Sequence, residues 1–115
     1  MSEVLNPVDA ETAIRNLGNR LSECVKIVTQ TEAVYVEKKR VFDIAEAKAT
    51  LAADGSNAQE RAAVVTLAVE NERLELDVAF LAFRDAERRM RAIREQLSAA
   101  QSLSRSVLTM YGAAS

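Results

Sequence analysis

The sequence offers few side chains of the types that carry out catalysis or bind metals. Histidine is absent from all 115 residues, so the chain has no imidazole base near neutral pH, no Ser–His pair and no His metal ligand. Cys24 is the only cysteine, which excludes an intrachain disulfide and a thiolate metal cage. Gly18, Gly55 and Gly112 lie too far apart to form a phosphate-binding loop. We therefore expect no enzyme, and no catalytic, cofactor-binding or metal-binding residues.

Two clusters of charged residues are candidates for a binding site. Glu70, Glu72, Glu75 and Asp77 crowd one stretch, but carboxylate-bridged metal sites in helical bundles use Glu-x-x-His pairs, which this sequence lacks. Five arginines fall within residues 84–94, and these form a possible patch for an anionic partner: Arg84, Arg88, Arg91 and Arg94, with Arg89 beside them. No aromatic residue is interleaved with them to stack on bases. We favour a solvated face held by local pairs, such as those between Glu87 and Arg91 and between Asp85 and Arg89.

The composition is that of long helices packed on one another. Hydrophobic residues make up 49% of the chain, aromatic residues 4% and charged residues 28%, while only three Gly and one Pro are present. The formal net charge of −2 argues against a general nucleic-acid coat or a membrane-surface protein. The longest apolar run, residues 78–83, is far shorter than the ~20 residues of a membrane span. We expect a cytoplasmic protein without a membrane partner.

The pattern predicts one all-α domain over residues 7–110, built as a long antiparallel two-helix hairpin of coiled-coil type. The first helix covers about 7–53, with Asn6 as its cap and Pro7 at its first position. A turn at 54–57 contains Gly55, which can adopt the left-handed conformation, and Ser56 or Asn57 caps the second helix with Gln59 or Glu60 as the capping-box partner. The second helix covers about 58–110, and residues 1–6 and 111–115 are expected to be flexible. A bend is also possible at Gly18.

Apolar residues at heptad spacing define the predicted contact between the helices. The seam of the first helix contains Ile14, Leu21, Val28, Tyr35, Phe42 and Ala49, with Leu17, Cys24, Thr31, Lys38, Ala45 and Ala52 as companions. The seam of the second helix is predicted in two phases: Val64, Leu67, Asn71, Leu74, Val78 and Leu81, then, after a stutter, Phe83, Ala86, Met90, Ile93, Leu97 and Ala100. A turn centred between Gly55 and Ser56 pairs Val28 with Phe83 and brings Lys38 near Glu75.

Two helices that touch along one seam cannot cover all of this apolar surface. Ile27, Val34 and Val41 recur every seven residues beside the main seam, and Phe80 faces away from Leu81. We predict that these four residues, Ile27, Val34, Val41 and Phe80, form an interface in a dimer or larger assembly, most simply a four-helix bundle. A groove for another protein's helix is the alternative use of the same surface.

Part of the chain, from Thr31 to about residue 105, resembles small helical-hairpin proteins encoded by bacteriophages, often beside DNA recombination and replication genes. The residues that carry the resemblance are Tyr35, Ala45-Glu46-Ala47-Lys48-Ala49, Leu51, Asp54-Gly55, the run 57–62, Arg91 and the run 96–102. The resemblance implies no catalytic or binding residue. With it, we expect a non-enzymatic, oligomeric helical protein that binds a protein partner, either phage DNA-processing machinery or a host factor. The alternatives are a DNA-binding accessory that uses the arginine band 84–94 and a virion assembly scaffold or chaperone.

Overall fold

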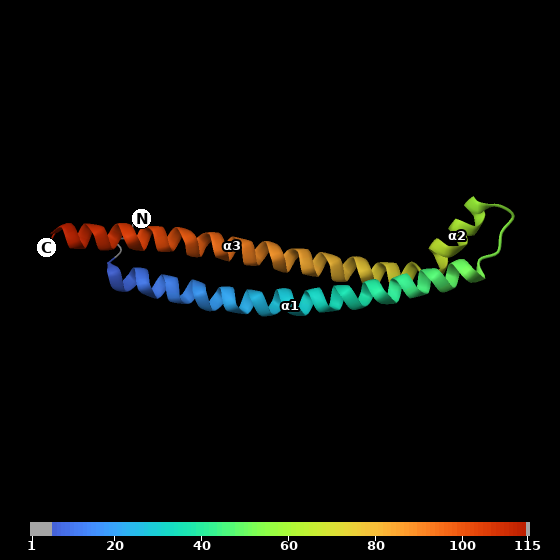
Figure 1. Ribbon diagram of the computed structural model, residues 1–115, viewed down its shortest axis with the longest axis horizontal. Helices are drawn as coiled ribbons and strands as arrows, with labels where there is room; N and C mark the ends of the chain where they lie inside the picture. The colour runs from blue at the N-terminus through green and yellow to red at the C-terminus, as the bar shows by residue number, and fades with distance from the viewer. Residues whose placement is uncertain (1–5, 115) are drawn as a thin grey trace. The chain divides into compact units, whose positions relative to one another are not determined.

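The computed structural model describes residues 6–114, and these residues form helices without any β-strand. The helices are α1 (Pro7–Ala52), α2 (Ala58–Ala68) and α3 (Glu70–Ala114). The described chain divides into two units: unit 1 contains residues 6–28 and 86–114, and unit 2 contains residues 29–85. Within each unit, α1 and α3 pack side by side and run antiparallel (Figure 1), so the predicted all-α helical hairpin is confirmed.

Side-chain caps begin the helices where the sequence predicts them. The Asn6 side chain accepts a hydrogen bond from the Asp9 backbone N–H at 2.9 Å, and this fixes the start of α1. At α2 the Asn57 side chain accepts from the Glu60 N–H at 2.8 Å, while the Glu60 carboxylate accepts from both the N–H and the hydroxyl of Ser56. The bonds from Ser56 lower the pKa of Glu60, because they stabilise its charged form. A capping box thus joins the connection at 53–57 to α2.

The predicted ends of the chain need two adjustments. Residues 1–5 and 115 lie outside the described residues, and Asn6, predicted to be part of a flexible end, is the cap of α1. The predicted end of the second helix at residue 110 is wrong, since α3 continues to Ala114. Val107 is buried in unit 1 and continues the spacing of the α3 seam, which explains why the last turns remain helical.

The α1 seam lies where the heptad pattern places it. All of its predicted residues are half-buried or buried except Ala52, the last residue of α1, and Phe42 is buried most completely. Lys38 and Thr31 occupy the two polar positions of this seam. The Lys38 side chain crosses to α3, where its Nζ lies 3.2 Å from the Glu75 Oε2. The expected proximity of Lys38 and Glu75 is therefore confirmed.

The second predicted phase of the α3 seam, residues 83–100, is confirmed, because all six of its members are half-buried or buried, but the first phase is wrong. The first predicted phase, residues 64–81, faces outward, and all six of its members are exposed. The observed seam keeps one phase, with alternating steps of four and three residues and no stutter: Val65, Val69, Glu72, Leu76, Ala79 and Phe83 in unit 2, and Ala86, Met90, Ile93, Leu97, Ala100, Ser104 and Val107 in unit 1. The prediction of the first phase was wrong because it selected the more apolar of two stripes that have the same spacing.

Within unit 2 the pairing of α1 with α3 is shifted from the prediction by less than one heptad. Phe83 was predicted to meet Val28, but in unit 2 its ring stacks on Tyr35, with 5.8 Å between the centroids. Phe80 also contacts Tyr35, at 5.4 Å. The connection at 53–57 is no tight turn, and α2 is inclined to α3 (Figure 1), so more residues are used before the chain lies alongside α1.

The interruption between α2 and α3 is a single residue, Val69. Its φ of −109° and ψ of 18° depart from helical values, yet its N–H still bonds to the Val65 carbonyl at 3.1 Å. Its own carbonyl accepts from the Arg73 N–H at 2.9 Å. The chain therefore bends at Val69 without losing these backbone hydrogen bonds, and the Val69 side chain is buried.

The glycines that the sequence analysis singled out act differently from expectation. No described glycine has a positive φ, so the predicted left-handed conformation of Gly55 is wrong. Gly55 instead permits a close approach, because a Cβ there would lie 3.2 Å from the Arg61 backbone nitrogen and the Glu60 Cβ. α1 passes through Gly18 as continuous helix, and a Cβ at Gly18 would meet no atom within 4 Å.

These two glycines give opposite predictions. Gly18→Ala should raise the free energy of unfolding by about 0.5–1 kcal/mol, since alanine restricts the unfolded chain and the added methyl group meets open space. Gly55→Ala should lower it, because the added Cβ forces the connection away from Arg61. Urea denaturation followed by circular dichroism measures both changes. If the free energy of unfolding changes in the same direction in the two variants, the different roles given to Gly18 and Gly55 are contradicted.

Candidate protein-interaction surface

An exposed apolar stripe runs along the side of α2 and α3 that faces away from the seam in unit 2. Its members, called the outer stripe here, are Val64, Leu67, Asn71, Leu74, Val78 and Leu81. The exposed fractions of its five apolar residues are 42% for Val64, 72% for Leu67, 62% for Leu74, 60% for Val78 and 64% for Leu81. The steps of three and four residues are those of a helix-packing seam, but no helix among residues 6–114 covers it.

A groove between α1 and α3 extends this apolar surface within unit 2. It has a volume of about 380 Å³ and is lined by Val34, Lys38, Leu74, Glu75, Val78, Ala79 and Ala82. Val34 is 50% exposed on the α1 wall, and the small side chains of Ala79 and Ala82 leave the floor shallow. The ion pair between Lys38 and Glu75 lies among the lining residues. The outer stripe and the groove share Leu74 and Val78, so they form one continuous apolar surface.

The four predicted interface residues do not belong to one face. Val34 lines the groove, while Val41 is half-buried. Phe80 is only 37% exposed, because it packs on Tyr35 and lies under the Arg84 guanidinium, 5.6 Å from the ring centroid. Val34 precedes a seam residue on α1 and Phe80 follows one on α3, and such positions flank opposite edges of an antiparallel pair.

Ile27 lies in unit 1 and lines a separate groove of about 660 Å³ there. The groove residues are Asn19, Arg20, Glu23, Cys24, Ile27, Arg89, Ala92, Ile93 and Gln96. Cys24 is half-buried at its seam position, in keeping with the small packing role that its place in the heptad predicts. Charged and amide side chains border this groove, so it is less apolar than the surface of unit 2.

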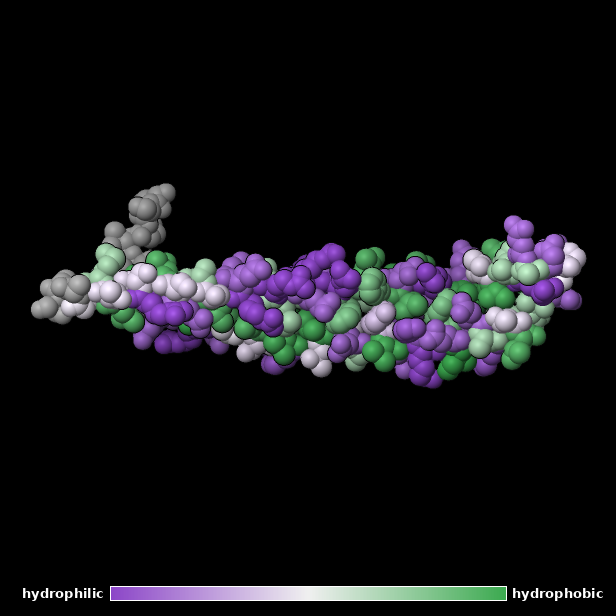
Figure 2. Space-filling view, turned by 45° about the horizontal axis from the view of Figure 1, so that its top comes forward, coloured by the Kyte–Doolittle hydropathy of each residue, from purple (hydrophilic) through white to green (hydrophobic). Residues whose placement is uncertain are grey.

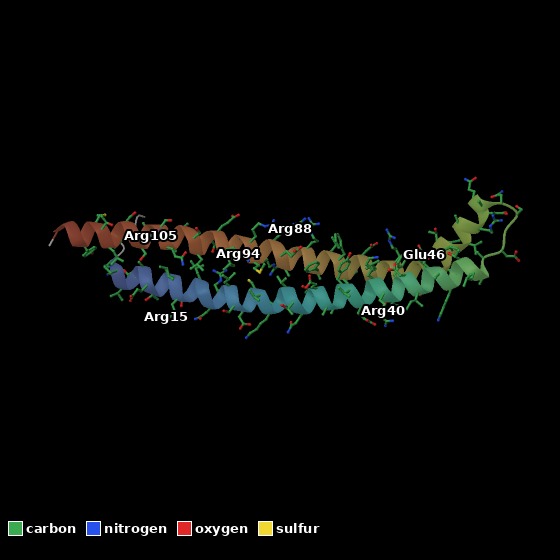
Figure 3. All side chains as sticks on the ribbon, in the orientation of Figure 1. Arg15, Arg40, Glu46, Arg88, Arg94 and Arg105 are labelled. Carbon is green, nitrogen blue, oxygen red and sulfur yellow. The ribbon has the colours of Figure 1, made fainter. Side chains whose placement is uncertain are left out.

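The arginine band divides between the two units. Arg84 belongs to unit 2, while Arg88, Arg91 and Arg94 are exposed in unit 1. These three arginines form no ion pair within the described part of the chain, and the predicted pair of Arg91 with Glu87 is not formed. Arg88 extends away from α1 (Figure 3), and hydrophilic side chains gather over the middle of α3 (Figure 2).

The two units differ in charge. Residues 1–28 and 86–115 together contain eight basic and six acidic residues, whereas residues 29–85 contain seven basic and eleven acidic residues. Several carboxylates of unit 2 are paired: Glu37 with Arg40 at 2.7 Å, Asp43 with Lys39 at 3.2 Å, and Asp77 with Arg73 at 3.5 Å. The hydrogen bond from Arg40 lowers the pKa of Glu37. Glu70 forms no ion pair with any described residue, so its charge remains available at the surface.

The described residues give no sign of a metal centre or a membrane span. Across residues 6–114 no group of three or more Cys, Asp or Glu side chains is arranged to hold a metal ion. In the same range, no helix combines the length and apolarity needed to cross a bilayer. No family model, no curated protein and no solved structure matches this chain.

Glu72 is the one carboxylate placed inside the seam. It stands between Val69 and Leu76, it is half-buried, and its Oε2 is buried with no hydrogen-bond partner among the described residues. An unpaired buried oxygen costs stability that an apolar side chain at the same position would not.

Glu72→Leu should therefore stabilise the protein by about 1–2 kcal/mol, because it removes the desolvated oxygen and extends the apolar seam. Glu70→Leu, on the exposed face of the same helix, is the matched control and should change stability by less than about 0.5 kcal/mol. Chemical denaturation measures the free energy of unfolding of both variants. A Glu72→Leu variant that is less stable than wild type would show that the carboxylate makes a stabilising contact.

Proposed function

We propose that this chain is a non-enzymatic helical interaction protein that acts by packing the outer stripe and the groove of unit 2 against a helix of a binding partner. The observation that carries the proposal is the second heptad-spaced apolar stripe, from Val64 to Leu81, which the chain leaves exposed. Large apolar patches on soluble proteins mark interaction surfaces. The partner can be a second copy, as the sequence analysis expected, or another protein, and the resemblance to phage hairpin proteins suggests phage DNA-processing machinery or a host factor.

The surface can be tested with matched pairs of substitutions. Val34→Asp with Val78→Asp places two charges in the groove, while Val8→Asp with Val36→Asp places them at valines that are equally exposed but lie outside it. If the partner is a second copy, light scattering should give masses above the monomer mass of 12.6 kDa for wild type and control, and the monomer mass for the groove variant. If the partner is another protein, affinity capture should retain it with wild type and control but not with the groove variant. A wild-type chain that is monomeric and retains no protein in a groove-dependent manner would contradict the proposal.

A second candidate function is the binding of nucleic acid by the arginine band. It is favoured by the three exposed arginines of unit 1, Arg88, Arg91 and Arg94, which no carboxylate neutralises. Phosphate contacts by such residues make affinity fall steeply with salt, with a slope of about −0.9 per neutralised phosphate on duplex DNA.

Substitution of all three arginines by Gln should reduce that slope by up to about 3 and abolish retention of DNA at low salt. Fluorescence anisotropy with a labelled duplex over a salt series measures the effect. Arg40→Gln with Arg61→Gln, in unit 2, serves as the control. DNA binding that is unchanged in the triple variant would remove this candidate.

A further inference from the structure

The outer stripe has the geometry of a surface that receives one helix. Four of its six positions, from Asn71 to Leu81, lie on α3 and span 11 residues, which corresponds to about 16 Å of helix at 1.5 Å per residue. Val64 and Leu67 lie on α2, beyond the bend at Val69. An apolar face with the same spacing on a partner helix of about three turns would cover the α3 part of the stripe. The proposed function, on which this inference rests, leaves the chemistry of the partner helix open.

The edges of the outer stripe are acidic. Glu70 and Asp77 border one edge, each one residue before a stripe residue, and Glu75 borders the other edge. Between residues 60 and 77 the chain carries five acidic residues against two basic ones. Arg73 pairs with Asp77 and lies over the Phe42 ring, Lys38 of α1 pairs with Glu75, and Arg61 bonds to the Gly55 carbonyl. Asp77 and Glu75 are thus in exposed ion pairs, and Glu70 is the border carboxylate that forms no ion pair with a described residue.

A second copy is a poor match for this pattern. When two stripes pack antiparallel with all six positions overlapping, Glu70 of each copy lies beside Asp77 of the other, and Arg84 meets only Ala63. A shift by one heptad in one direction brings Asp77 beside Asp77 and Glu70 beside Arg84, and a shift in the other direction brings Glu70 beside Glu70 and Arg61 beside Glu75. These shifted arrangements therefore mix like and opposite charges, and each leaves two of the six positions uncovered. In a parallel pair, Glu70 of one copy faces Glu75 of the other. Like charges at these flanking positions oppose packing.

We propose that the outer stripe of unit 2 binds an amphipathic helix of another protein whose apolar face is flanked by Lys or Arg. Basic residues at the flanks of that helix meet Glu70, Asp77 and Glu75, while its apolar residues cover Leu74, Val78 and Leu81. Asn71, the one polar residue of the stripe, sets the register of the partner through its amide group. The acidic surplus of unit 2 also attracts a basic helix from a distance and raises its association rate at low salt.

Two synthetic peptides test the proposal on the full chain. Both are 21-residue helices with leucines at heptad spacing, and they differ only in the flanking residues, which are Lys in one and Glu in the other. Fluorescence anisotropy should show the Lys peptide binding at least tenfold more tightly than the Glu peptide at low salt, with the difference narrowing as salt rises. Glu70→Gln with Asp77→Asn should weaken the Lys peptide about fivefold, whereas Glu11→Gln with Glu32→Gln, at two exposed carboxylates of α1, should leave it unchanged.

The outcomes separate this proposal from the proposed function. One outcome is that both peptides bind equally, that the Glu70 and Asp77 substitutions have no effect, and that Leu74→Asp abolishes binding. This outcome would overturn the proposal of a basic partner helix but would leave the proposal of helix binding intact. Self-association that blocks both peptides and is released by Leu74→Asp would show that a second copy occupies the stripe, which also overturns the basic partner. A monomeric chain that binds neither peptide would overturn both proposals.

Discussion

The structure depends on one constraint: α1 and α3 can bury only the single line of side chains along which they touch. No described side chain is removed from solvent completely, and the most buried residues, such as Ala79, Phe42 and Ile93, all lie on that line. A hairpin with so little interior must place every other apolar residue at the surface. The exposed leucines of unit 2 are a direct result of this geometry, and the same geometry explains why an unpaired oxygen at Glu72 has a measurable cost.

Much of the fold could be predicted because local signals agreed. The α1 seam was identified correctly, because this helix offers one strong heptad pattern. Asn6 and Asn57 were identified as caps because short polar side chains before a helix accept hydrogen bonds from its first backbone N–H groups. The second phase of the α3 seam, residues 83–100, was also identified correctly, but the first phase was not, because residues 64–83 contain two patterns with the same spacing. The more apolar of them, with Leu74 and Val78, lies outside, and the one that packs includes Glu72. Hydrophobicity ranks two such stripes, but only the partner helix decides which is used.

The register of α1 against α3 could not be predicted from the heptad pattern. A heptad pattern specifies which residues lie on the seam but not how far one helix slips along the other, so the pattern did not predict that Phe83 stacks on Tyr35. The slip is set by the connection at 53–57 and the inclination of α2, which the sequence pattern does not encode. Once the seam and register were misplaced, Val34 and Phe80 were assigned to one face although they flank opposite edges. Val34 remains part of the candidate surface, and Leu74 and Val78 join it.

The bend at Val69 has a consequence for the way the protein opens. α2 contains no buried residue, and its first turn is held by the bonds between Asn57, Ser56 and Glu60. Unwinding from the connection up to Val69 therefore gives up a capping box and helical backbone bonds while every fully packed position of the seam stays in place. Amide protons of residues 58–68 should accordingly exchange with solvent through local fraying, and those beyond Val69 only when the hairpin itself separates.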